Sequence, residues 1–174
     1  MNRVLLDACV LYPSITRALL IGAANAGLFQ PLWSARILDE WQHTAARRGV
    51  GPQADIEIAL LRANWPKAEV LPDEELTARL VLPDRNDRHV FAAAITGGAH
   101  ELLTRNLKDF PPRVLARSGI IRREPDGFLL EMAEGMAAVV DDVHHKAEAM
   151  AGAKIARRSL LKKAGLPRLG KYFM

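Results

Sequence analysis

An uninterrupted apolar run near the N-terminus, stopped by an aspartate, is the feature that most constrains the fold. Residues 4–6 show no alternation of polar and apolar side chains, which is typical of a strand buried on both faces of a parallel sheet. Asp7 ends the run, and residues 14–27 then show helical apolar spacing with a glycine at the end. A strand followed by a helix begins a βα unit, so the sequence predicts an α/β fold with a parallel sheet.

The amino-acid composition agrees with this fold class. Hydrophobic residues make up 49% of the 174 residues, whereas aromatic residues make up only 6%. Alanine and leucine dominate, and both form helices more readily than strands. We therefore expect one sizeable core, in one domain with an appendage rather than in two full domains.

The apolar spacing predicts further helices and strands along the chain. Helices are expected at residues 35–48, 54–64, 84–96 and 111–117. A second buried strand is expected at residues 101–104 and a last edge strand at residues 120–121. Residues 28–33 contain Pro31, which cannot donate a hydrogen bond to a neighbouring strand, and this favours an edge strand or an extended loop.

The pattern becomes purely helical after Pro125 and Gly127. We therefore predict an α/β domain at residues 1–123 and a helical C-terminal extension at residues 124–174. An extension of this size buries little surface alone, so it should pack on the domain or on a partner.

The C-terminal 24 residues carry seven basic residues and no acidic one, which leaves the rest of the chain at about −3. A positive tail on a mildly acidic body favours contact with a phosphate backbone. The alternative is a pair of ordinary solvated helices. The candidate RNA-binding residues are Arg157, Arg158, Lys162 and Lys163.

Cysteine usage and the N-terminus indicate the compartment. The single cysteine, Cys9, cannot form an internal disulfide, which fits a reducing cytoplasm. The apolar run before Asp7 is shorter than a signal peptide or a membrane span requires. We expect a cytoplasmic protein without membrane insertion.

Asp7 is the first candidate site residue, because it follows the first buried strand. In open parallel sheets, ligands gather beyond the carboxyl ends of the strands. A lone charge buried there costs several kcal/mol in rough terms, so it needs hydrogen-bond donors, a metal or a shifted pKa. The alternative is a turn aspartate that caps the next segment.

Asp84 and Asp87 lie at the start of a predicted helix. Their spacing resembles a capping box, with Asp84 as the cap. Helical periodicity nevertheless places Asp87 on the same stripe as Val90 and Phe91, toward the core, and this points to a function for Asp87.

Two further groups lie on other predicted elements. Glu40 flanks the apolar face of the helix at residues 35–48, whereas Asp39 points further out. Thr104, Asn106 and Asp109 follow the second buried strand and should therefore lie near Asp7. Taken alone, these residues could form only a turn, with Asp109 as a helix cap.

Together these stretches resemble the PIN-domain family, specifically the VapC-like ribonuclease toxins of bacterial toxin–antitoxin pairs. The resemblance covers roughly residues 1–122 and rests on the stretches VLLDACVLYP, SARILDEW, PDRNDRHVFAAAI and LLTRNLKDFP. It implies a three-layer α/β/α fold and an acidic pocket formed by Asp7, Glu40 and Asp87. It also implies a homodimer silenced by a cognate antitoxin protein.

The resemblance implies an endoribonuclease that uses Mg²⁺ or Mn²⁺. Carboxylate oxygens prefer these hard ions, which activate water for attack on phosphorus. In many relatives an aspartate matches the position of Asn106, so either this acid is missing or Asp109 replaces it as a catalytic residue. Thr104 and Asn106 would orient water or a carboxylate by hydrogen bonds.

Two alternatives remain open. The same acidic pocket could serve a nuclease that acts on DNA. A non-catalytic PIN-like module that binds RNA or a protein is the other alternative, and Asn106 is its main support. The sequence contains neither a glycine-rich phosphate loop nor a serine–histidine–aspartate pattern that would suggest other hydrolase chemistry.

Overall fold

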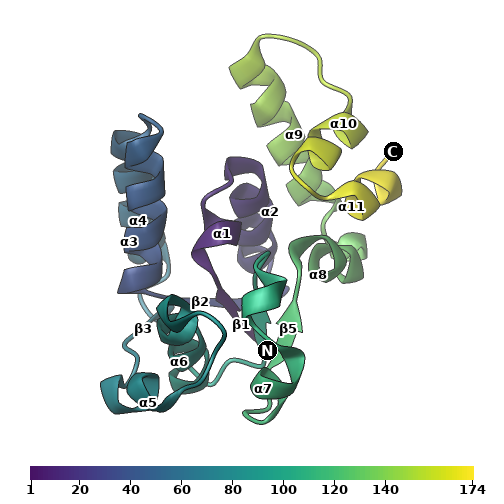
Figure 1. Ribbon diagram of the computed structural model, residues 1–174. Coiled ribbons are helices and arrows are strands. Elements are labelled where there is room, and N and C mark those ends of the chain that lie inside the picture. The colour runs from purple at the N-terminus through teal and green to yellow at the C-terminus, as the bar shows by residue number, and fades with distance from the viewer.

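Five short strands pair in parallel to form one sheet in the order β3-β2-β1-β4-β5 (Figure 1). In this computed structural model, which describes residues 1–174, the strands are β1 (Arg3–Leu6), β2 (Gln30–Ser34), β3 (Glu69–Val70), β4 (Glu101–Leu103) and β5 (Ile121–Arg123). Helices flank the sheet, and this arrangement confirms the predicted α/β class.

Seven helices connect the strands, and five of them agree to within a few residues with the segments predicted above, whereas α1 was not predicted. They are α1 (Ala8–Leu11), α2 (Ser14–Asn25), α3 (Ala35–Arg47), α4 (Gly51–Asn64), α5 (Glu74–Arg79), α6 (Arg88–Thr96) and α7 (Pro112–Ala116). Short 3₁₀ turns precede two of them, namely η1 (Arg85–Asp87) and η2 (Leu107–Asp109). The clearest difference is α4, which begins three residues before the predicted position 54.

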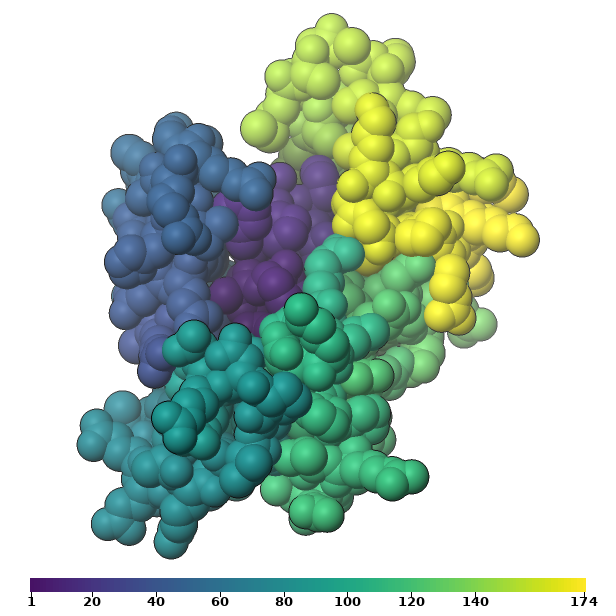
Figure 2. All heavy atoms as spheres, in the orientation of Figure 1, coloured from purple at the N-terminus to yellow at the C-terminus, as the bar shows by residue number.

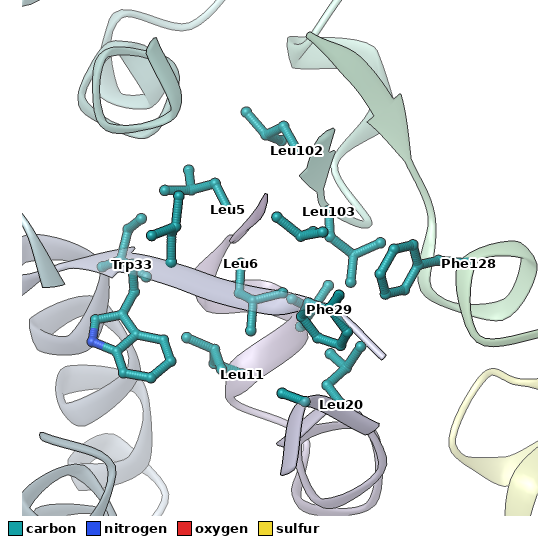
Figure 3. Close-up of a cluster of buried hydrophobic side chains, with 14 of the residues drawn as sticks. Leu5, Leu6, Leu11, Leu20, Phe29, Trp33, Leu102, Leu103 and Phe128 are labelled. Carbon is teal, nitrogen blue, oxygen red and sulfur yellow. The ribbon is translucent and has the colours of Figure 1, made fainter. Parts of the chain in front are cut away.

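The leucines of the central strands explain why β1 and β4 lie in the middle of the sheet. Successive side chains of a strand point to opposite faces, and Leu5 and Leu6 point to opposite sides in Figure 3. Both are fully buried, as are Leu102 and Leu103 on β4. Apolar side chains on both faces require helices on both faces, which is the arrangement observed.

The expectation that residues 28–33 form an edge strand or a loop is wrong, because β2 is an interior strand between β1 and β3. Along β2, the Gln30 amide donates to the Asn2 carbonyl just before β1, and the Trp33 amide donates to the Ala68 carbonyl on the β3 side. Alternation therefore turns the nitrogen of Pro31 toward the β3 side, where β3 begins to pair only at Trp33. The proline is tolerated because its position needs no ladder donor.

The C-terminal segment is helical, as predicted, and packs on the rest of the protein. Its elements are α8 (Pro125–Glu131), η3 (Ala133–Gly135), α9 (Ala137–Ala151), α10 (Arg157–Lys163) and α11 (Pro167–Tyr172). One continuous cluster of buried side chains includes residues from both sides of position 124. The rings of Phe29 and Phe128 meet edge to face, with centroids 5.1 Å apart. The division into two domains at residue 123 stays a prediction.

The strand register brings several loops together at the carboxyl edge of the sheet. Leu6 pairs with Leu103, and the Asp7 amide donates to the Leu103 carbonyl. Thr104, which follows β4, therefore lies beside Asp7. On the other side of Asp7, Ser34 ends β2 and is followed directly by α3. None of the helices is both long enough and apolar enough to cross a membrane.

Candidate functional site

Asp7 lies directly after β1 with both carboxylate oxygens engaged. Its Oδ1 accepts a hydrogen bond from the Ala8 amide at 2.8 Å, so Asp7 does cap α1. Its Oδ2 accepts from the Thr104 hydroxyl at 2.8 Å. Only 6% of the residue is exposed, and burial raises its pKa above the ordinary value in spite of these hydrogen bonds. Asp7 can therefore cap α1 and also belong to a functional site.

Cys9 joins Asp7 to the loop after β4. Its thiol lies 3.4 Å from Asp7 Oδ2 and 3.4 Å from the Thr104 hydroxyl, and its sulfur accepts from the Arg105 amide. Burial, together with the charge of Asp7, raises the pKa of the thiol to about 11. Cys9 therefore stays protonated and can donate to Asp7, a role that the sequence did not indicate.

A group of three aspartates forms the most compact acidic cluster. One carboxylate oxygen from each of Asp84, Asp87 and Asp109 lies within 4.8 Å of the others. Asp84 also accepts from the Asn86 amide, as its predicted capping role requires. Asp109 caps no helix, because α7 begins at Pro112 with Pro111 in the cap position and no side-chain cap, so that alternative is wrong.

Asp87 faces this cluster instead of capping its own helix. The only hydrogen bond of its side chain comes from Asn106, whose amide nitrogen donates to Asp87 Oδ2 at 3.3 Å. Burial, followed by the charges of Asp7, Asp84 and Asp109, raises the pKa of Asp87 to about 6. The capping-box interpretation therefore describes Asp84 and not Asp87.

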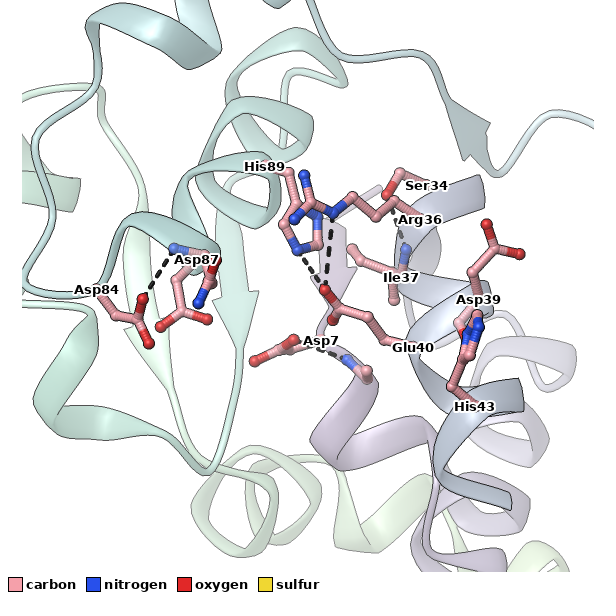
Figure 4. Close-up of polar contacts among 12 residues, drawn as sticks. Asp7, Ser34, Arg36, Ile37, Asp39, Glu40, His43, Asp84, Asp87 and His89 are labelled. Atoms are coloured by element: carbon pink, nitrogen blue, oxygen red, sulfur yellow. Dashed lines mark hydrogen bonds and ion pairs between the residues drawn. The ribbon is translucent and has the colours of Figure 1, made fainter. Parts of the chain in front are cut away.

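Glu40 approaches from α3 on the opposite side of Asp7, as Figure 4 shows. Ser34 caps this helix by accepting from the Ile37 amide at 3.2 Å. Glu40 Oε1 lies 2.6 Å from His89 Nε2 and 3.9 Å from Arg36 Nε. Asp39 is exposed and points away, as predicted.

Three of the predicted acids share one pocket of about 660 Å³ at the carboxyl edge of the sheet, and Asp109 does not line it. Asp7, Glu40, Asp87 and Asn106 all contribute to its lining, together with residues from α1 and the end of α3. Asp84 and Asp109 extend the negative charge beyond Asp87. The structure thus brings together the acids that the sequence placed on four separate segments.

The chemistry of these side chains fits a divalent cation. No lysine, arginine or histidine nitrogen lies within 4.0 Å of the carboxylates of Asp7, Asp84, Asp87 or Asp109. Burial is the main cause of the raised pKa values of Asp7 and Asp87, and the charges of neighbouring carboxylates raise them further. A hard cation among several carboxylate oxygens would relieve the repulsion, so the triad of Asp84, Asp87 and Asp109 could bind one.

His89, near the start of α6, is only 4% exposed, and its Nε2 lies 2.6 Å from Glu40 Oε1. No local pattern indicates this contact, because α3 and α6 meet only in the folded chain. Tyr12, Arg47 and Arg48 also line the acidic pocket and were not identified from the sequence.

The four basic residues predicted to bind RNA lie on α10, away from the lining of the acidic pocket. Arg157 is paired with Asp141 at 2.5 Å, whereas Arg158, Lys162 and Lys163 are exposed. The end of α10 nevertheless reaches the loop after β4, because Arg105 donates to the Ala164 carbonyl at 2.8 Å. Their contact with RNA stays a prediction.

A parallel α/β fold with a carboxylate pocket at the carboxyl edge of its sheet defines a class of proteins able to hold a divalent metal against a ligand. A family model described as the PIN domain matches residues 3–108, which is more than half of the chain. The chain belongs to the PIN-domain family, whose members are generally metal-dependent nucleases. No curated protein and no solved structure matches the chain.

Proposed function

We propose that this protein is an endoribonuclease that depends on Mg²⁺ or Mn²⁺. The observation that carries the proposal is the pocket that Asp7, Glu40 and Asp87 share at the carboxyl edge of the sheet. Membership of the PIN-domain family supports the proposal that nuclease activity takes place in this pocket. The resemblance to VapC-like toxins supports RNA as the substrate.

Asp84, Asp87 and Asp109 would hold the metal beside the pocket that Asp87 shares with Asp7 and Glu40. When bound, such an ion supplies Lewis-acid activation of a phosphate and of water. Carboxylate oxygens favour magnesium or manganese over softer metals. Asp7 would complete the ligand set.

The other residues of the pocket would hold the acids in place. Thr104 and Cys9 orient Asp7, and Asn106 orients Asp87, through the hydrogen bonds described above. Glu40, held by His89, can accept the proton of a water molecule that attacks phosphorus. The water oxygen then forms a bond to phosphorus as the bond to the leaving oxygen breaks.

We further propose that the protein is the toxin of a toxin–antitoxin pair and that it acts as a homodimer in the cytoplasm. The resemblance to VapC-like toxins supports both statements. A groove between α2, α4 and α9, lined by Ile15, Leu60 and Met150, offers apolar surface for the antitoxin. Leu60 and Met150 are 55% and 90% exposed, and exposed apolar side chains of this kind suit an amphipathic helix.

The test compares the wild-type chain with Asp7→Asn on matched RNA and DNA oligonucleotides, with Mg²⁺, with Mn²⁺ and with EDTA. We expect metal-dependent cleavage of RNA by the wild type and a loss of at least 100-fold in Asp7→Asn, because Asn keeps the shape but removes the charge. Induced expression in bacteria should arrest growth with the wild type only.

Each outcome has a definite meaning for the proposal. Equal cleavage of RNA and DNA would contradict the RNA assignment, because only an RNA-directed site reads the 2′-hydroxyl. Equal activity of both proteins would remove Asp7 from the site. Absence of cleavage by the wild type, without metal binding that depends on Asp7, would instead support a non-catalytic binding module.

A further inference from the structure

The outward face of α3 carries a regular row of polar side chains. Arg36, Glu40, His43 and Arg47 recur at intervals of four, three and four residues, so they lie on one side of the helix. Ile37, Leu38, Trp41 and Ala45 are buried on the other side. We call the four outward residues Arg36, Glu40, His43 and Arg47 the α3 strip. It spans about 16 Å along the helix axis, at about 1.5 Å per residue.

At the C-terminal end of the strip, two arginines enter the acidic pocket without a carboxylate partner. Arg47 and Arg48 line the same pocket as Asp7 and Asp87. Both arginines are exposed, and no carboxylate lies within 4.0 Å of either. The Arg48 guanidinium lies over the Tyr12 ring, 5.1 Å from its centroid.

At the N-terminal end of the strip, a second pocket of about 390 Å³ gathers more arginines. Arg36, Arg85 and Arg88 line it, with Glu74 as its only carboxylate. His89 also lines this pocket and lies 2.6 Å from Glu40 of the acidic pocket. The two pockets therefore adjoin at Glu40, with cations on both sides of the acids. Figure 4 shows Arg36, Glu40 and His89 at this junction.

Cations that flank an acidic centre match a ligand with a row of negative charges, and only Arg36 among them lies within 4.0 Å of an acid of that centre, Glu40. A phosphate backbone is such a ligand, because successive phosphates can meet successive arginines while one phosphate enters the centre. Tyr12 and Arg48 add a ring and a guanidinium plane beside this path. Unpaired bases stack on such groups, whereas the bases of a duplex are not available to them.

We propose that the α3 strip binds a single-stranded nucleic acid along α3, with phosphates held on both sides of the cleavage position. Arg36 and Arg85 hold the strand on one side, and Arg47 and Arg48 hold it on the other. A base stacks at Tyr12. This inference rests on the proposed nuclease function and adds to it the form of the substrate and its path. Figure 2 shows the segments that carry this path, the blue α3–α4 pair and the teal segment next to it.

The test measures binding without cleavage, by fluorescence anisotropy of a labelled single-stranded RNA in EDTA. We expect the double variant Arg47→Ala/Arg48→Ala to bind at least tenfold more weakly. The slope of log K against log salt should fall by about 1.4, at about 0.7 per lost phosphate contact. Arg36→Ala/Arg85→Ala should behave in the same way. The matched control, Arg113→Ala/Arg117→Ala, removes two exposed arginines on and beside α7 and should bind like the wild type.

Several outcomes would overturn the inference. The first is unchanged binding by both arginine double variants. The others are equal binding of a duplex of the same sequence and no binding by the wild type. A loss seen only in Lys162→Ala/Lys163→Ala would assign the strand to α10 instead. Cleavage assays separate this inference from the proposed function. A chain that binds as expected but never cleaves RNA contradicts only the proposed nuclease activity. Variants that lack these arginines but cleave RNA normally contradict only the proposed path of the strand.

Discussion

At the scale of single residues, Asp87 is where the charge of the pocket affects stability most directly. Its pKa of about 6 in the folded chain is well above the ordinary value of 3.8. Between these two values the folded state binds more protons than the unfolded state. The free energy of unfolding therefore falls as pH rises from about 4 to about 6, and the loss persists at higher pH.

Asp87→Asn should remove this effect in the metal-free protein. At pH 7.5 in EDTA we expect the variant to be more stable than the wild type by about 1 kcal/mol, a value reduced for the partial exposure of the side chain. At pH 4 the difference should nearly vanish. Thermal unfolding at both pH values measures it, with Asp55→Asn on the exposed face of α4 as the control. A difference that does not change with pH would argue against charge repulsion at Asp87.

At the scale of elements, α3 links the sheet to the site. It begins at the carboxyl end of β2, where the buried Ser34 hydroxyl accepts from the Ile37 amide. Six residues further along, Glu40 lies at the junction of the two pockets. The start of α3 therefore sets the position of Glu40 and of the arginines that follow.

Ser34→Ala should cost about 1 kcal/mol of stability, as the loss of a helix cap usually does. Ser14→Ala is the matched control, because Ser14 is exposed at the start of α2 and α2 has no side-chain cap. Its effect should stay within about 0.5 kcal/mol. Urea denaturation measures both. Equal effects of the two substitutions would mean that the Ser34 cap contributes nothing specific.

At the scale of the whole molecule, the C-terminal helices share the core of the α/β part. Besides the Phe29–Phe128 contact, Asp126 on α8 accepts hydrogen bonds from the Arg168 and Leu169 amides at 3.0 Å each. Arg105, in the loop beside the pocket, donates to Ala164 near the end of α10. These contacts connect the appended helices to the loop that carries Asn106.

Phe128→Ala should therefore destabilise the entire chain and not only its C-terminal part. We expect a loss of about 3–5 kcal/mol, as for other buried phenylalanines, in a single unfolding transition. Calorimetry of the full chain distinguishes the possibilities. Two transitions, of which only the lower one shifts, would show that residues 1–123 unfold independently, as the predicted domain division allows.

The sequence by itself determined the local features, because they depend on neighbours along the chain. The apolar run of β1, the inward stripe that sets Asp87 apart, and the outward direction of Asp39 all follow from periodicity within one element. Asp7 was placed at the carboxyl edge by the same reasoning. In a parallel sheet the carboxyl ends of the strands lie at one edge, so the acidic pocket was largely predictable.

Only the tertiary structure decided which residues meet across elements. The pairing of His89 with Glu40, the link from Cys9 to Thr104, and the closeness of Asp84 to Asp109 join segments that are distant in sequence. Pro31 in an interior strand depends on where β3 begins, which no local rule gives. Such contacts arise from packing of the whole core, in which each element is placed by the burial of all the others.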